Sequence, residues 1–269
     1  MTSTSRSAPH RDLTCALPQQ PAEHAQSPVD ASLSGVARLY GDAALAAFQV
    51  AQVTIVGVGG VGGWVAEALV RSGVGALRLV DADDVCSTNL NRQVHALRST
   101  IGRSKLHALR QRLVDIQPGV TLHLEPVFLD ATNVEDIVQA PTTYLVDAID
   151  DLAEKARLLD AAARHHVPTL VAGGAGGRRD PLALRAAPLG EAHGDPLLRA
   201  LRRRLRHDHG WSPDHPGWAF PAVFSTEALQ PASSNGEGRA CEGRYGTSVA
   251  VVGALGLAIA STLLGRLAV

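Results

Sequence analysis

The string IVGVGGVGGW at residues 55–64 passes from apolar residues into glycines, a pattern that suits phosphate binding. Glycine has no Cβ, so its backbone N–H can approach phosphate oxygens, and the N-terminus of a following helix adds a favourable field. The glycines concerned are Gly57, Gly59, Gly60 and Gly62. Asp81 ends the next apolar segment, where an acid can bind ribose hydroxyls. These features fit a dinucleotide used for hydride transfer as well as ATP.

Cationic and amide side chains follow on a loop and the helix after it, and they discriminate between these readings. They are Asn89, Arg92, Gln93 and Lys105. A triphosphate that must lose PPi needs cations nearby, whereas a pyrophosphate already bound by backbone N–H groups needs few. Asp147 and Asp150 end a later apolar segment, where carboxylates could hold Mg²⁺. The combination favours adenylation with ATP and Mg²⁺; a nicotinamide or flavin oxidoreductase is the alternative.

Alternating strands and helices must position these residues. Strands are expected at 52–58, 76–84, 120–129, 143–150 and 167–177. Helices are expected at 34–48 with a break at Gly41, and at 63–73, 99–118, 133–139, 151–166 and 195–210. This order predicts an α/β fold with a Rossmann-like, doubly wound, mainly parallel sheet, and ligands beyond the carboxyl ends of its strands.

The chain divides by composition into three parts. Residues 1–30, rich in Ser, Pro, Ala and Gln, are expected to be a disordered tail without a secretory signal. Residues 31–177 are expected to form a nucleotide-binding core, and residues 178–269 an extension packed on the same domain. The net charge of −1 carries no sign of a polyanionic partner, and three separated cysteines indicate neither a disulfide framework nor a zinc site. A cytoplasmic location is expected.

The run YGTSVAVVGALGLAIASTLLG at residues 245–265 has no charge and is long enough to span a membrane. Its Gly, Ala and Ser residues favour a buried helix instead. A membrane-anchored scaffold is the corresponding alternative.

The order GxGGxG, DxD, NxNRQ, GxxK and DAxD resembles that of the E1-like adenylating enzymes of the ThiF/MoeB type, from about Val36 to Gly177. Further strings, among them RLYG, NRQVHALRSTIGRSK, GGAGGRRDP and VFSTEAL, resemble the tRNA threonylcarbamoyladenosine dehydratase branch and extend the match over nearly the whole chain after the first thirty residues. The resemblance implies ATP-dependent cyclisation of N6-threonylcarbamoyladenosine at position 37 of tRNA through an acyl-adenylate. The paired CxxC zinc ligands frequent in sulfur-carrier-activating relatives are missing, which counts against the alternative, adenylation of a sulfur-carrier protein's C-terminal glycine.

The resemblance also implies roles for single residues. The four glycines would line the phosphates, and Asp81 and Asp83 would belong to the nucleotide site. Asn89, Arg92 and Lys105 would stabilise phosphate charge, Gln93 would shape the same pocket, and Asp150 would hold Mg²⁺. Arg38 would reach from a second subunit into the ATP site of a homodimer. A monovalent cation and a cysteine desulfurase or sulfur-acceptor system are further candidates.

The substrate side is less defined by the sequence. Ser225, Thr226 and Glu227 are expected to face the substrate, and the arginines of residues 199–209 are expected to contact tRNA phosphates. The candidates for base stacking are Trp211, Trp218, Phe220 and Phe224. His95 is expected to pack on a helix face rather than to act as a general base.

Overall fold

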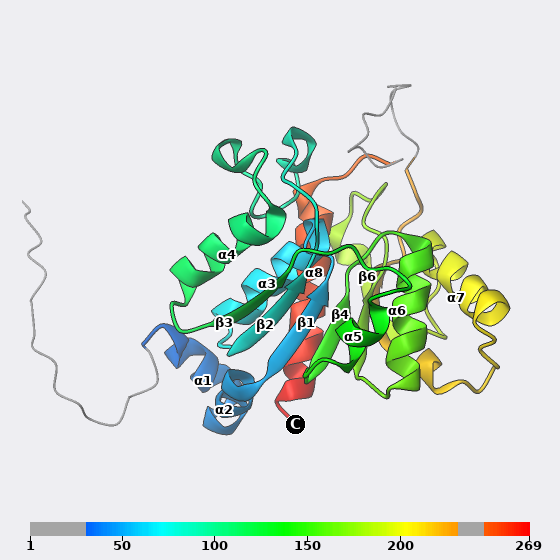
Figure 1. Ribbon diagram of the computed structural model, residues 1–269, viewed down its shortest axis with the longest axis horizontal. Helices are drawn as coiled ribbons and strands as arrows, with labels where there is room; N and C mark the ends of the chain where they lie inside the picture. Colours follow the sequence, from blue (N-terminus) through cyan, green and yellow to red (C-terminus); the bar gives the residue numbers. More distant parts are fainter. Residues whose placement is uncertain (1–30, 231–244) are drawn as a thin grey trace, which may run out of the picture.

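The computed structural model describes residues 31–230 and 245–269, which form a seven-stranded sheet in the order β3-β2-β1-β4-β5-β7-β6 (Figure 1). The strands are β1 (Gln52–Val56), β2 (Ala76–Val80), β3 (Thr121–Glu125), β4 (Tyr144–Asp147), β5 (Thr169–Ala172), β6 (Leu184–Pro188) and β7 (Pro221–Ser225). Every pairing is parallel except that of β6 with β7. The expected tail at residues 1–30, with Cys15, and the third cysteine, Cys241, lie outside the described residues.

Helices cover both faces of the sheet. They are α1 (Ser34–Tyr40), α2 (Asp42–Val50), α3 (Gly60–Arg71), α4 (Lys105–Ile116), α5 (Val134–Gln139), α6 (Leu152–Arg164), α7 (Pro196–Asp208) and α8 (Val249–Leu267). One core cluster joins α2, α3, α4 and α8 to the sheet, a second joins α5 and α6 to it, and α7 packs on α6. The prediction of a doubly wound, mainly parallel α/β fold is confirmed.

The strand order places a topological switch point between β1 and β4. The chain runs outward from β1 through β2 to β3 and then returns to the other side of β1. In open α/β sheets ligands bind at such a switch point, outside the carboxyl ends of the strands. The four glycines follow β1, Asp147 is the last residue of β4, and Asp150 lies just beyond it.

Several element boundaries differ from the predictions. The helix expected at 99–118 is a short 3₁₀ turn, Arg98–Thr100, followed by α4 from Lys105, because Gly102 takes a φ of +79°. The helix expected from residue 63 already begins at Gly60. The region after residue 177, in which no strand was assigned from the sequence, contributes β6 and β7. The glycine break at Gly41 is confirmed, with a φ of +90° between α1 and α2.

The apolar C-terminal run forms α8, which lies beside α3 (Figure 1). A Cβ on Gly256 would lie 2.7 Å from Trp64 Cβ and 2.8 Å from Val61 O, so glycine allows the two helices to approach closely. Among the described helices α8 is long and apolar enough to cross a membrane, yet half of its most apolar window is buried in the protein. Its packing against α2, α3, β5 and β7 is that of a core helix.

Candidate functional site

The glycine loop after β1 is shaped by contacts that exclude side chains. Gly57 has a φ of +85°, and a Cβ there would lie 2.9 Å from Ala148 O. A Cβ on Gly62 would lie 1.9 Å from Gly57 O. Gly59 caps α3, and no side chain of the described residues accepts a hydrogen bond at that cap. The first N–H groups of α3 are therefore available to an anion at the carboxyl edge of the sheet.

We expect Gly62→Ala to lower the free energy of unfolding by about 3 kcal/mol, because the added methyl group meets backbone rather than a movable side chain. ATP binding, measured by titration calorimetry on any folded fraction, should be lost as well. Gly119→Ala is the control, because a Cβ at Gly119 meets nothing within 4 Å. Wild-type thermal stability for Gly62→Ala would contradict this description of the loop.

Asp81 is fixed at the end of β2 by both of its oxygens. The Val58 N–H donates to Oδ2 and the Asp83 N–H donates to Oδ1, each over 2.9 Å. Burial raises the pKa of Asp81, and the charge of Lys105 opposes that rise. The carboxylate therefore lies directly against the glycine loop, where a ribose would follow the phosphates.

Lys105 and Asp83 join the loop after β2 to the first turn of α4. Lys105 Nζ lies 2.6 Å from Asp83 Oδ2, and the Lys105 N–H donates to Asp83 O over 3.0 Å. The Lys105 side chain is 8% exposed and that of Asp83 is 52% exposed. The structure thus brings Asp81, Asp83 and Lys105 together beside the glycine loop.

The loop that carries Asn89, Arg92 and Gln93 lies over the start of α3. Asn89 is buried and its Oδ1 accepts from the Cys86 N–H over 2.9 Å. The indole of Trp64 donates to Arg92 O over 3.0 Å.

The side chains of this loop approach the glycines. Arg92 Cγ lies 3.8 Å from the place of a Gly60 Cβ, and Gln93 Nε2 lies 3.6 Å from the place of a Gly59 Cβ. Gln93 is buried, and its Oε1 has no hydrogen-bond partner in the described part of the chain.

The two aspartates at the carboxyl end of β4 differ in their surroundings. Asp147 is fully buried, with Oδ2 2.9 Å from Lys155 Nζ. Asp150 is exposed. No group of three or more His, Cys, Asp or Glu side chains in the described residues could hold a metal ion. Because Mg²⁺ often takes one or two carboxylates together with phosphate oxygens and water, Asp150 fits such a role with bound ATP.

His95 itself lies in the loop before the Arg98–Thr100 turn, not in a helix. The ring packs against Gly63, and its two nitrogens have no hydrogen-bond partner among the described residues. Burial and the charges of Lys105 and Arg112 lower the pKa of His95 to about 4. A neutral, enclosed ring is unsuited to exchange protons with a substrate near neutral pH.

The lowered pKa of His95 predicts a pH-dependent stability. Between pH 6.5 and 4 the unfolded chain binds a proton that the folded protein does not, so the free energy of unfolding falls as pH falls. The loss from this residue should reach about 3 kcal/mol near pH 4. Urea unfolding from pH 7.5 to 4.5 should show a shallower pH dependence for His95→Gln than for the wild type. Parallel curves for the two proteins would contradict the assignment.

The polar residues after β7 make contacts inside the chain. Ser225 is buried and its Oγ accepts from the Glu227 N–H over 3.2 Å. Thr226 Oγ1 donates to Ala183 O over 3.1 Å. Glu227 Oε2 accepts from the N–H groups of Arg179 and Asp180 over 2.8 Å each. These bonds fix the loops beyond β5 and β7, and the expected substrate contact stays a prediction.

Two of the expected stacking residues are enclosed. Trp211 is 3% exposed and Phe224 fully buried, so neither can stack on a base. Trp211 instead stacks on His215 with ring centroids 4.0 Å apart. Trp218 and Phe220 are partly exposed.

Arg38 lies apart from the other site residues of its own chain. It is exposed on α1, which lies with α2 at the end of the sheet where the strands begin (Figure 1). Gly75, just before β2, donates its N–H to Phe48 O of α2, which fixes this placement. The five residues of β1 separate that end from the glycine loop by roughly 16 Å at about 3.3 Å per residue.

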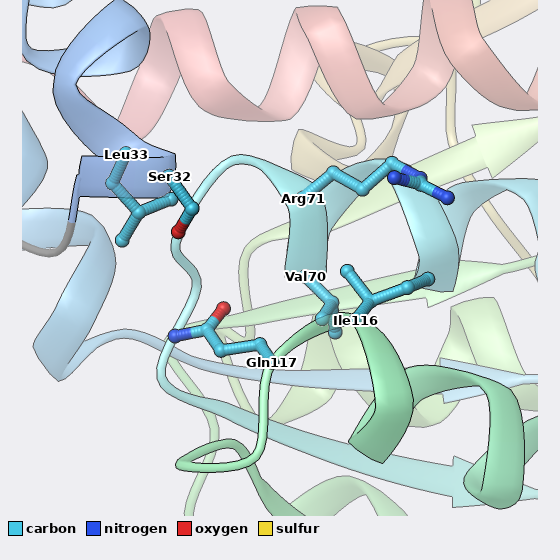
Figure 2. A pocket seen from close by; sticks show the side chains of 6 residues that line it. All are labelled: Ser32, Leu33, Val70, Arg71, Ile116 and Gln117. Atoms are coloured by element: carbon cyan, nitrogen blue, oxygen red, sulfur yellow. The ribbon is translucent and has the colours of Figure 1, made fainter. Parts of the chain in front are cut away.

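A cavity of about 130 Å³ lies at the same end of the molecule, between the start of α1 and the last turns of α3 and α4 (Figure 2). Its lining is Ser32, Leu33, Val70, Arg71, Ile116 and Gln117. None of the residues assigned to nucleotide binding contributes to it, so it plays no part in the site at the carboxyl edge.

The ThiF family model matches residues 33–265. The chain belongs to the ThiF family. This ThiF protein is 42% identical over 203 residues to the tRNA threonylcarbamoyladenosine dehydratase of Escherichia coli (strain K12), covering 75% of this chain and 76% of that protein. The crystal structure of that dehydratase, TcdA, in complex with ATP has a TM-score of 0.81 at 37% identity and covers 88% of this chain and 93% of that one. Similarity to the sulfur carrier protein ThiS adenylyltransferase of the same organism, 33% identical, covers 46% of this ThiF protein.

The family assignment confirms the resemblance seen in the sequence. Within the described chain the predicted nucleotide residues converge, with Arg38 as the exception. Lys155, which no sequence pattern singled out, pairs with Asp147 behind them.

Proposed function

We propose that this protein is an ATP-dependent tRNA threonylcarbamoyladenosine dehydratase, which cyclises N6-threonylcarbamoyladenosine at position 37 of tRNA. The observation that carries the proposal is the convergence of the glycine loop, Asp81, the Asp83–Lys105 pair and the Arg92 loop at the carboxyl edge of the sheet. It occurs in a chain that matches the E. coli dehydratase over three quarters of its length. ATP is the nucleotide that such a site would hold.

The reaction follows from the weakness of a carboxylate as an electrophile. The free carboxylate of the modification attacks the α-phosphate of ATP, PPi leaves, and a mixed anhydride remains. The carbamoyl group of the same side chain then closes onto the activated carbonyl and expels AMP, so that the nucleoside loses one water. Ring closure is intramolecular and is favoured by proximity, so it needs no enzyme nucleophile.

Charge stabilisation is the chain's own contribution to the first step. Lys105 and Arg92 neutralise negative charge on the departing phosphates, and the N-terminus of α3 adds its field to theirs. Mg²⁺, when bound with ATP, screens phosphate charge, and Asp150 would be its protein ligand. Asp81 orients the ribose.

The active unit we propose is a homodimer in which Arg38 acts on the partner's ATP. The exposure of Arg38 and its distance from its own glycine loop support this arrangement. We also propose a cytoplasmic location, which an ATP- and tRNA-dependent reaction supports. A monovalent cation and a cysteine desulfurase or sulfur-acceptor system stay predictions from the resemblance.

The arginine-rich helix α7 is the proposed contact for tRNA. Its apolar residues, Leu198, Leu201 and Leu205, are buried, which leaves Arg199 and Arg203 exposed. Burial and the charges of Arg206 and Arg199 lower the pKa of Arg202, which indicates a concentration of positive charge. Such a surface binds phosphates without reading base sequence.

Replacing Arg199 and Arg203 together by alanine should weaken tRNA binding and flatten its salt dependence. Each lost phosphate contact should reduce the slope of log K against log salt by about 0.7–0.9. Filter binding at several NaCl concentrations measures this. Arg110→Ala, an exposed arginine on α4, removes a similar charge elsewhere and should change neither quantity. An unchanged slope in the double variant would place tRNA on another face.

The activity itself is tested by incubating the purified protein with ATP, Mg²⁺ and tRNA that bears threonylcarbamoyladenosine. Nucleoside mass spectrometry should show a product lighter by one water, and omission of ATP should abolish it. A folded protein that produces no such shift would overturn the proposal. ATP–PPi exchange that depends on a ubiquitin-fold partner and ignores tRNA would assign the chain to carrier-protein activation instead.

A further inference from the structure

A buried ion pair lies directly behind the proposed metal ligand. Asp147 ends β4, Lys155 lies in the second turn of α6, and both side chains are 0% exposed. Burial raises the pKa of Asp147, and the neighbouring ammonium of Lys155 opposes that rise. A buried pair is costly to desolvate and is often no more stabilising than a well-packed apolar pair. Its geometry therefore needs an explanation other than stability.

The ammonium of Lys155 contacts both ends of the turn that precedes Asp150. Nζ lies 2.9 Å from Asp147 Oδ2 and donates to Ile149 O over 3.1 Å and to Asp147 O over 3.5 Å. The ammonium thus makes one ion pair with the buried carboxylate and two hydrogen bonds to carbonyl groups of the turn. Asp147 Oδ1 also accepts from the Ile149 N–H over 3.3 Å. One side chain thus fixes both ends of the Asp147–Ile149 turn, and Asp150 is the next residue.

The same turn forms one wall of the glycine loop. The Ala148 N–H donates to Val56 O over 3.0 Å, which extends the pairing of β4 with β1. Ala148 O lies 2.9 Å from the place of a Gly57 Cβ, and Ala148 Cβ lies 3.3 Å from that of Gly62. A movement of this turn would shift Asp150 and the phosphate-binding loop relative to each other.

We propose that Lys155 is a positioning residue: with Asp147 it holds residues 147–150 so that the Asp150 carboxylate stays at a fixed place relative to phosphates on the glycine loop. The inference rests on the proposed use of Mg²⁺ and ATP. Lys155 touches neither nucleotide nor metal, and it acts through the backbone of the turn.

The test compares Asp147→Asn/Lys155→Met, which removes both charges, with the wild type. In metal-free and nucleotide-free protein, amides 148–151 of the double variant should exchange hydrogen at least tenfold faster than those of the wild type, because the contacts of Lys155 with the turn are lost. The Mg²⁺ concentration for half-maximal PPi release should rise at least tenfold, with a smaller change in the rate at saturating Mg²⁺. Glu67→Gln is the matched control, because Glu67 is a buried carboxylate paired with Arg71 and Arg112 away from this turn. It should lower stability without changing either readout.

The proposal would be overturned if a folded double variant showed wild-type hydrogen exchange at amides 148–151 and wild-type Mg²⁺ dependence. The pair would then contribute only to packing. Should the double variant not fold, Asp147→Asn alone should show the same two changes at smaller size, and their absence would be equally decisive. A wild-type protein that lacks the dehydratase activity would refute the proposed function, whereas the exchange measurement would still decide whether Lys155 holds the turn.

Discussion

Lys105→Ala should reduce PPi release by about 10²- to 10³-fold, the range found when one preorganised charge-stabilising donor is removed. The ammonium lies beside Asp83 and acts on Asp81, so it is available to the phosphates of a nucleotide whose ribose lies at Asp81. Stability should change little, because the released partner Asp83 is half exposed and can be solvated. A PPi-release assay with saturating ATP, Mg²⁺ and modified tRNA, together with a thermal melt, measures both effects.

The neighbouring exposed arginine provides the control for Lys105. Arg103→Ala removes a positive charge two residues away on the solvent side and should retain near wild-type PPi release. If Lys105→Ala and Arg103→Ala behave alike, the ammonium contributes only to the general potential of the loop. A Lys105→Ala protein with full activity would remove Lys105 from the proposed mechanism.

Arg38→Ala and Asp150→Ala should each abolish PPi release, and a mixture of the two should regain activity. If Arg38 acts in the partner's site, a mixed dimer holds one site with both residues intact and one with neither. Random exchange between equal amounts of the two variants then gives about a quarter of wild-type activity, because half of the dimers are mixed and each has one working site of two. Titration of the mixture by PPi release after subunit exchange measures this.

The mixing experiment needs proof that subunits exchange, which native mass spectrometry with one isotopically labelled variant supplies. Arg98→Ala, an exposed arginine in the 3₁₀ turn before α4, serves as the control substitution and should stay active by itself. No regained activity despite demonstrated mixed dimers would show that Arg38 does not act across subunits. An Arg38→Ala protein with full activity would show that it has no role.

The parts of the site that could be predicted from the sequence are those fixed by local chemistry. The glycines predict phosphate contact because the close approach at Gly57 and Gly62 leaves no space for a Cβ. Asp81 ends a strand next to them, so the parallel pairing of β1 with β2 alone brings it to Val58. Short, apolar, β-branched strands between amphipathic helices were sufficient to indicate the doubly wound sheet.

The features that could not be predicted depend on contacts between distant segments. Asp147 and Asp150 are both acids at the end of one apolar run, so their spacing does not distinguish them. Asp147 pairs with Lys155 because both are buried, and this burial could not be predicted from the sequence. β6 pairs antiparallel with β7 across more than thirty residues, without alternation clear enough to mark the strand. Trp211 is enclosed by residues from other elements, so its burial excludes the base stacking that its residue type indicated.

The close fit of α8 against α3 has a consequence for biosynthesis. A nascent chain that has emerged only as far as β7 lacks Val251, Leu255, Ile259 and Leu263, which complete one face of the core. That face, including the half-covered Trp64, then stays open to water and to other chains. Gly60 of the glycine loop packs against Val252 of α8, whose Cγ1 lies 2.7 Å from the place of a Gly60 Cβ. We therefore expect the chain to bind ATP only after α8 has been synthesised and has packed against α3.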